Sequence, residues 1–446
     1  MQNLTQKAAE IPEAEQTFFA EIERRVQTAL DRLNTQIDLE GTAGYSGALV
    51  RRRVIQTALH LLRLVLTYCL TDYSLRMIGL WGTVMGWGSL SKSGVRQRLC
   101  HCQKWLGVLI GQLLLLEKLS LPSGVKARVC IFDASSVSRP GSHKCDWRLH
   151  LGFDLSGARL TDIRLTDHHV GETLTHWQFQ PGEICLADRI YGVPRSLGVV
   201  LAALAWFVIR IGWQNLPLQD EAGCHFAIAP WLTVQSSDPA ATPAQVRVWV
   251  ATPQGRFPIR LIARAIPVAK ADKIRQRLRA EAKKNKRRLD ERTLLAAGFV
   301  MVVSNLPEEV WCAHNILALY RFRWQIELVF KRLKGLLEFD HLRAFDPQLA
   351  QVYLLGKLLI ALLLSEAEWR FALAVAETFT DPHRPVSRWR LSQLLLGALR
   401  RSICGVMTFD LIQEYLPQLR RYLCDEPRRR IRQLHSLNFQ EVVYGW

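Results

Sequence analysis

The hydrophobic pattern of the chain changes its period near residue 126, and this change limits the folds open to it. Before that point, residues 17–120 carry apolar side chains at helical spacing. After it come short runs that are β-branched or alternate in polarity, at 128–137, 146–156, 159–169, 183–192 and 205–213, with a helix expected over 194–204. Three neighbouring strands followed by strand, helix and strand is the order of a mixed α/β sheet.

Further elements follow this sheet. The segment 214–256 is rich in Pro, Gln and Ala, and β-like runs over 245–266 indicate an inserted, mostly β subdomain. Another strand is expected over 298–307, and apolar helices over 350–373 and 387–403. The predicted domains are an N-terminal helical DNA-binding domain (1–122), an α/β core in two parts (123–213 and 298–345), a β-rich insertion with a basic arm (214–297) and a C-terminal helical domain (346–446).

Residues 74–106 read as helix, Gly-rich turn and helix, an order that resembles a helix-turn-helix. Ser91 or Ser93 is the expected N-cap of the second helix. That helix offers four cations for contacts with phosphate: Lys92, Arg96, Arg98 and Lys104. Helical hairpins with glycine turns are common, so DNA binding and simple packing both remain open for this pair.

Positive charge is in excess. The 446 residues hold 58 Lys and Arg against 40 Asp and Glu, a net charge of +18, which favours nucleic acid as a partner and, second, an acidic membrane surface. Residues 256–292 contain 14 basic and four acidic residues. Such a segment is either a phosphate-facing arm or a solvated basic helix. The tail is basic again, at Arg428, Arg429, Arg430 and Arg432.

The composition otherwise indicates a globular protein without a membrane span, with 49% hydrophobic and 22% charged residues. Charges interrupt the most apolar runs before they reach the ~20 residues that cross a bilayer. The polar start lacks a secretory signal, so the mature chain is expected to begin near Met1. Ten cysteines without a CxxC pair are expected to be reduced, mostly buried thiols of a cytosolic protein.

Residues 320–337 are predicted to form one helix with two distinct faces. At about 100° per residue, one stripe collects the apolar side chains Phe322, Ile326, Val329, Phe330, Leu333, Leu336 and Leu337. A second stripe collects Tyr320, Arg323, Glu327 and Lys334. This stripe is either a solvated face with an i, i+4 ion pair between Arg323 and Glu327, or one side of a functional site.

Three carboxylates are candidates for that site. Asp133 and Asp188 are each predicted to end a buried strand, where α/β proteins commonly form sites, and Glu327 would join them from the helix. Acids can share a small space only if a cation neutralises them or their pKa values rise, and oxygen ligands favour Mg²⁺ or Mn²⁺ as that cation. Two such ions about 4 Å apart would support phosphodiester cleavage. Other acids are read as turn and edge residues, and the histidines as surface or core residues: Asp146, Asp154, Asp162, Asp167, His143, His150, His168, His169 and His176.

The spacing of Tyr320, Arg323, Glu327 and Lys334 resembles the YREK signature of bacterial transposases of the "insertion sequence four" family. The segments around Asp133 ("IFDASSV") and Asp188 ("ADRIYG") resemble the family's first and second aspartate motifs. The resemblance runs from about residue 51 to residue 343. It implies that Asp133, Asp188 and Glu327 are a catalytic DDE triad.

The resemblance also implies a ribonuclease H-like core with a β-strand insertion, and flanking helical domains. It implies an enzyme that binds double-stranded DNA at inverted repeats and at the target. Such an enzyme nicks the ends, forms a hairpin and transfers strands within a synaptic homodimer, using two Mg²⁺ ions that Mn²⁺ replaces. Tyr320, Arg323, Lys334 and Lys331 are the expected DNA contacts on the helix. Phe299 occupies the place of an aromatic residue that stacks on a flipped base, or it packs in the core.

Three functions fit these observations: an active transposase of the bacterial cytoplasm and nucleoid, a non-catalytic DNA-binding descendant, and a ribonuclease H-like nuclease without strand transfer. An altered acid would mark the second, and all three acids are present. Cutting and joining use the same two-metal chemistry, so the third is not separated from the first.

Overall fold

The computed structural model of the chain describes residues 37–119, 128–140, 142, 145–155, 159–375 and 387–405. The helical pattern expected over 17–36, His143 and the basic tail at Arg428–Arg432 lie outside the described residues.

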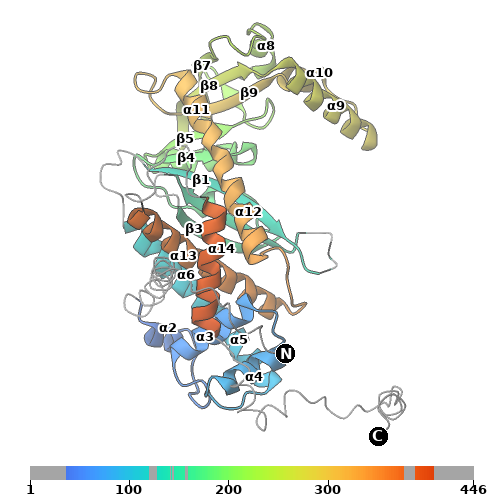
Figure 1. Cartoon of the computed structure of the whole chain (residues 1–446). Helices are drawn as coiled ribbons and strands as arrows, with labels where there is room; N and C mark the ends of the chain where they lie inside the picture. The colour runs from blue at the N-terminus through green and yellow to red at the C-terminus, as the bar shows by residue number, and fades with distance from the viewer. Residues whose placement is uncertain are drawn as a thin grey trace, which may run out of the picture.

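A nine-stranded mixed sheet runs through the middle of the molecule (Figure 1), in the order β3-β2-β1-β4-β5-β9-β8-β7-β6. The predicted first part is confirmed strand by strand: β1 (Val129–Val137), β2 (Trp147–Asp154), β3 (Arg159–Asp167), β4 (Ile184–Ala187) and β5 (Trp206–Arg210). β1, β2 and β3 are antiparallel neighbours, and β4 and β5 run parallel to β1. Helix α7 (Pro194–Ala202) makes the crossover between β4 and β5, with its proline at the first turn.

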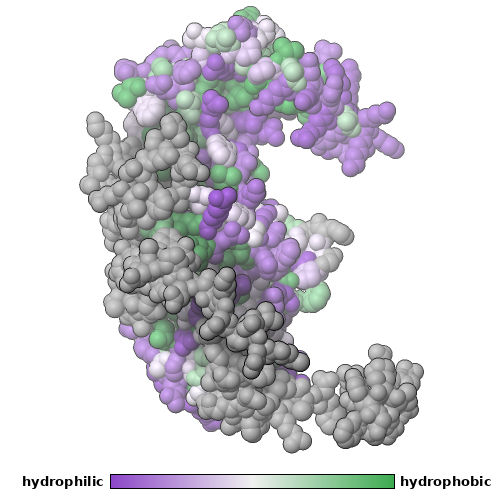
Figure 2. All heavy atoms as spheres, in the orientation of Figure 1, coloured by the Kyte–Doolittle hydropathy of each residue, from purple (hydrophilic) through white to green (hydrophobic). Residues whose placement is uncertain are grey.

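The segment 214–297 extends this same sheet. Its strands are β6 (Leu218–Gln219), β7 (Ala244–Thr252) and β8 (Gly255–Ala265), and β9 (Phe299–Ser304) pairs antiparallel with both β5 and β8. Its helices are α8 (Ile228–Thr233), α9 (Val268–Lys284) and α10 (Glu291–Ala296). Ala271 is the one fully buried residue of α9, and this helix projects from the body as a hydrophilic arm (Figures 1 and 2).

Helices from both ends of the chain pack together on one side of the sheet. They are α2 (Leu39–Tyr45), α3 (Ala58–Leu70), α4 (Leu75–Val84), α5 (Lys92–His101), α6 (Gln103–Leu119), α13 (Pro347–Val375) and α14 (Arg388–Cys404). α13 lies against α3 and α6 in a hydrophobic cluster that also takes in one face of the sheet. A Cβ at Gly356 of α13 would stand 2.4 Å from Cys69 Sγ of α3, so glycine permits this close approach. The domain limits given above remain predictions.

The helix predicted over 320–337 is divided in three. α11 (Ala313–Tyr320) passes into the 3₁₀ turn η3 (Arg321–Trp324) and then into α12 (Gln325–Leu337). The tighter 3₁₀ winding shifts the phase of the side chains. The assignment of Phe322 to the apolar stripe was therefore wrong, because Phe322 is 51% exposed, while Ile326, Val329 and Leu333 are buried as predicted.

One described helix segment, Pro347–Glu368 in α13, is long and apolar enough to cross a membrane, but 78% of its most apolar window is buried inside the protein, as in a core helix. Among the described residues, nine cysteines are free thiols, and five of these are buried. Ser91 is the N-cap of α5, as predicted, because its Oγ atom accepts a hydrogen bond from the Gly94 N–H at 3.1 Å.

Candidate active site

Asp133 and Asp188 lie side by side on neighbouring parallel strands. The register pairs Phe132 with Ala187, so the next residue on each strand is one of the two aspartates. Asp188 directly follows β4 in extended conformation, whereas β1 continues past Asp133 to Val137 through its pairing with β2. The prediction that Asp133 ends its strand was therefore wrong. Residues in register on parallel strands roughly 4.8 Å apart project to the same face of the sheet, and both carboxylates share one face.

Arg323 connects Asp133 to the helix. Its Nη1 atom is 3.5 Å from Asp133 Oδ2, and its Nη2 atom donates a hydrogen bond to Glu327 Oε1. The Arg323 side chain is 17% exposed, and its guanidinium stands between the half-buried Asp133 carboxylate and the more exposed Glu327. α12 packs against β1, which brings this helix to the aspartates. The i, i+4 ion pair anticipated from the sequence therefore forms, and it faces Asp133.

The surroundings of Asp133 disfavour an isolated negative charge. Burial raises the pKa of the Asp133 carboxyl to about 6; the Ala134 N–H and Arg323 lower it, and Glu172 and Asp188 raise it. Such a carboxyl gains most from a bound cation. In the part of the chain that the structure describes, no three His, Cys, Asp or Glu residues stand close enough together to hold a metal ion. Arg323 occupies the space between Asp133 and Glu327, and the oxygen donors suit a hard divalent cation once that space opens.

Glu172 is an acid that the sequence reasoning missed. It follows β3 in a loop, with its Oε1 atom 3.6 Å from Arg148 Nε on β2. Burial raises the pKa of Glu172, Arg148 lowers it and Asp188 raises it, so Glu172 adds to the negative charge around the aspartates. No strand or helical pattern surrounds Glu172 in the sequence, and therefore no local signal identified it.

A basic groove adjoins the site. It encloses about 1020 Å³, part of it open to solvent. Its basic and aromatic lining comes from β5, β8, α9, α11 and η3: Arg210, Arg264, Lys270, His314, Tyr320, Arg321, Arg323 and Trp324. Burial raises the pKa of the Tyr320 phenol, and the charge of nearby Asp188 raises it further. Tyr320 and Arg323 therefore belong both to the groove and to the surroundings of the carboxylates.

The other residues predicted to contact DNA from the helix and from the last strand, Lys334, Lys331 and Phe299, lie outside the basic groove. Lys334 and Lys331 are on α12, half-buried and exposed respectively, and Lys331 lines a second groove with Phe322 and Trp389. Phe299 opens β9, opposite Ala265, and packs half-buried against the hydrophobic cluster on the α7 side of the sheet. This packing agrees with the core alternative for Phe299.

The two arginines predicted on α5 are engaged within the protein. Arg96 Nε donates to Asp346 Oδ2 at 3.0 Å, and Arg98 Nη2 donates to the Arg51 carbonyl at 2.5 Å. Other acids and histidines have local roles as well: Asp146 pairs with Arg139 at 2.8 Å, and buried His150 meets the Thr166 hydroxyl at 2.9 Å. Asp154 is not the edge residue expected, because it is fully buried, 3.7 Å from Arg128 Nε.

The chain matches the family model of the transposase DDE domain over residues 125–364. It is 34% identical over 335 residues to the putative transposase InsL of insertion sequence element IS186A of Escherichia coli K12. That match covers 74% of this chain and 90% of the relative. The transposase of IS421 from Escherichia coli is 34% identical over 336 residues, with the same coverage.

The comparison with solved structures gives a match to the piggyBac transposase synaptic complex with hairpin DNA. The similarity has a TM-score of 0.43 and 9% sequence identity, and covers 89% of this chain and 84% of the other.

Proposed function

This chain belongs to the DDE transposase family, and we propose that it is a DNA transposase that cuts the ends of its own insertion sequence and joins them to a target. The observation that carries the proposal is the adjacency of the two aspartates, together with the arginine that lies between one of them and Glu327. Asp133 and Asp188 are adjacent in the sheet, and Arg323 links Asp133 to Glu327. The enzyme class is that of a polynucleotidyl transferase and endonuclease.

In this proposal Asp133, Asp188 and Glu327 hold divalent metal, two Mg²⁺ or Mn²⁺ ions. When bound, the metal supplies charge for a nucleophilic oxygen and for the leaving oxygen of a phosphodiester. The raised pKa of Asp133 supports this role, because a desolvated carboxyl beside a second acid gains from a neutralising cation. Glu172 adds negative charge near Asp133, and its carboxylate pairs with Arg148.

The cations of the groove position DNA. Arg323 and Arg321 offer planar donors to phosphates next to the reacting one, and Tyr320 offers a hydroxyl at the same place. Lys334 and Lys331 extend this surface along α12. An arginine-rich groove beside the acids can bind a DNA strand so that its reacting phosphodiester lies next to the carboxylates. Nicking, hairpin formation and strand transfer all require this positioning.

The α9 arm contributes a second DNA contact. At 100° per residue, Lys270, Lys273, Arg277 and Lys284 fall within an arc of about 60° of the helix surface, and all four are exposed. α9 has 17 residues, a length of about 25 Å. Because Lys270 also lines the basic groove, this stripe continues the cationic surface away from the active site, along a duplex.

The full reaction scheme is cut-and-paste transposition in a synaptic homodimer, on the DNA of the bacterial nucleoid. A gel assay tests it. The protein, Mg²⁺ and DNA that carries candidate terminal inverted repeats should give nicked, hairpin and joined products. Nicked DNA alone would identify a ribonuclease H-like nuclease, and binding without any product would identify an inactive descendant.

A further inference from the structure

The basic residues of the N-terminal helices differ in whether they contact other parts of the protein. Arg96 and Arg98, the expected phosphate contacts on α5, have partners inside the protein. Arg98 binds the backbone of the segment between α2 and α3, which we term the arginine loop (Tyr45–Arg53). Arg96 and Arg98 would have to give up these partners to bind phosphate with the same donors, so exposed side chains without such partners in the described structure are better candidates for DNA contact in this region.

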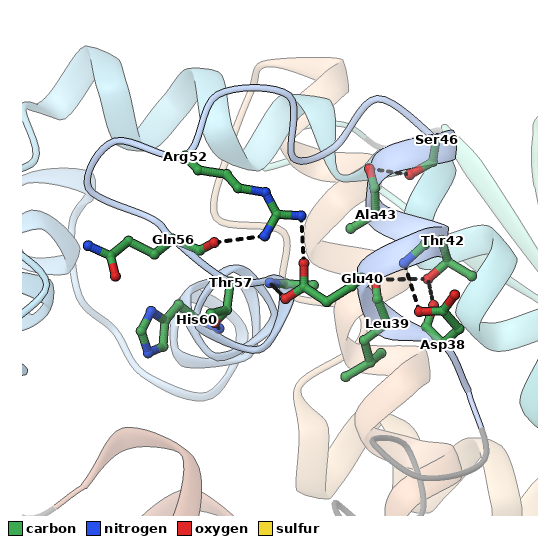
Figure 3. Close-up of polar contacts among 12 residues, drawn as sticks. Asp38, Leu39, Glu40, Thr42, Ala43, Ser46, Arg52, Gln56, Thr57 and His60 are labelled. Carbon is green, nitrogen blue, oxygen red and sulfur yellow. Dashed lines mark hydrogen bonds and ion pairs between the residues drawn. The ribbon is translucent and has the colours of Figure 1, made fainter.

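Internal hydrogen bonds hold the arginine loop in place. Glu40 accepts the Arg52 guanidinium at 2.8 Å through one oxygen and the Ala58 N–H at 2.7 Å through the other (Figure 3). Arg52 also donates to the Gln56 carbonyl at 3.1 Å. On the other side, Arg98 holds the Arg51 carbonyl. The loop is therefore tied to α3 and to α5, and its middle arginine is used for that purpose.

The side chains that remain point to solvent. Tyr45, the last residue of α2, is 92% exposed, and Val50 is 76% exposed. Arg51 and Arg53 are exposed, and neither forms an ion pair with an acid of the described residues. The nearby acids have other uses, since Glu40 binds Arg52 and Asp38 caps α2 through the Gly41 N–H at 2.8 Å. Two guanidiniums without an acidic partner in the described part of the chain, and one aromatic ring, thus stand on a fixed backbone.

We propose that the arginine loop is a DNA-binding site, in which Arg51 and Arg53 bind backbone phosphates and Tyr45 stacks on a base or lies in a groove. The proposal rests on the proposed function, which supplies DNA as the partner. A loop already ordered loses little conformational entropy when it binds. Guanidiniums bind phosphate oxygens in two-point geometry, and an aromatic face stacks on any base. Arg52 fixes the loop instead of contacting DNA.

The test measures duplex affinity of the full chain against salt, with candidate inverted-repeat DNA as the probe. Each phosphate contact contributes a slope of about −0.9 to log K against log salt. For the R51Q/R53Q double variant, the slope of log K against log salt should therefore be less steep by roughly 1.8, and the melting temperature should be unchanged. The control R195Q removes an exposed charge from α7, on the sheet face opposite α12, and should leave the slope as it is.

The Tyr45→Ser variant provides an independent test of the proposal. Loss of stacking should weaken binding roughly 5- to 150-fold with little effect on the salt slope, because no charge is removed. A double variant with the parental slope, together with a Tyr45→Ser variant of parental affinity, overturns the proposal. Failure of the proposed function looks different: the parental protein would then give no cleaved DNA, whatever these variants bind.

Discussion

Replacement of Arg323 by Gln should strengthen the binding of divalent cations to the protein without DNA. If Asp133 and Glu327 hold metal, the Arg323 guanidinium competes with that metal, because it contacts both carboxylates. At 3.5 Å from Asp133 and an effective dielectric constant of 20, the gross attraction is about 5 kcal/mol. Desolvation of the pair offsets much of it, and hydrogen bonds to charged groups contribute a net 1.5–3 kcal/mol or so.

A competition of about 2 kcal/mol corresponds to a roughly 30-fold change in Kd. The assay is calorimetric titration with Mn²⁺ at pH 8, where Asp133 is ionised in both proteins. Arg321→Gln is the matched control, since Arg321 is exposed on the same 3₁₀ turn and contacts neither acid in the described structure. An Arg323→Gln variant that binds Mn²⁺ no more tightly than the Arg321→Gln control would refute the competition.

Three further outcomes follow from the structure. The folded-state pKa of Asp133, about 6, lies above its ordinary value of 3.8, so ionisation of Asp133 destabilises the fold as pH rises from about 4 through 6. In EDTA, the free energy of unfolding of Asp133→Asn, measured with urea, should therefore exceed the parental value by on the order of 2–3 kcal/mol at pH 8 and equal it at pH 3.5. Gly356→Ala should cost about 1–3 kcal/mol because its Cβ meets Cys69, and a second change, Cys69→Ala, should restore part of the loss in thermal melts. Replacing Lys273 and Arg277 on α9 by Gln should lower the salt slope of DNA binding by about 1.8, whereas replacing Arg279 and Lys283, which are centred about 120° further around the helix, should not.

Strands β1 to β5 could be predicted because each one is a local hydrophobic pattern. Their order in the sheet was not predicted, and β4 lies beside β1 and not beside β3. Asp133 and Asp188 were singled out because each was expected to end a buried strand, but their neighbouring positions depend on the parallel pairing of β1 with β4, which the sequence did not indicate. Phe322 was misplaced because the 3₁₀ turn changes the helical phase, and nothing in residues 320–337 marks that turn.

Contacts between distant segments lay beyond the sequence. β9 inserts between β5 and β8, which makes the insertion continuous with the sheet, and strand propensity carries no information about such partners. Arg96 meets Asp346 across 250 residues, so an arginine that appeared free on a helix proved to be paired. Glu172 reached the site from a loop, where neither periodicity nor spacing predicts a position.

The central claim is that Asp133, Asp188 and Glu327 act together on DNA, and the Asp188→Asn variant tests it most directly. Asn keeps the size of the side chain and removes the charge beside Asp133. With Mg²⁺ and end DNA, this variant should show no nicked or joined product while its affinity for the DNA stays near the parental value. Cleavage at the parental rate would contradict the claim.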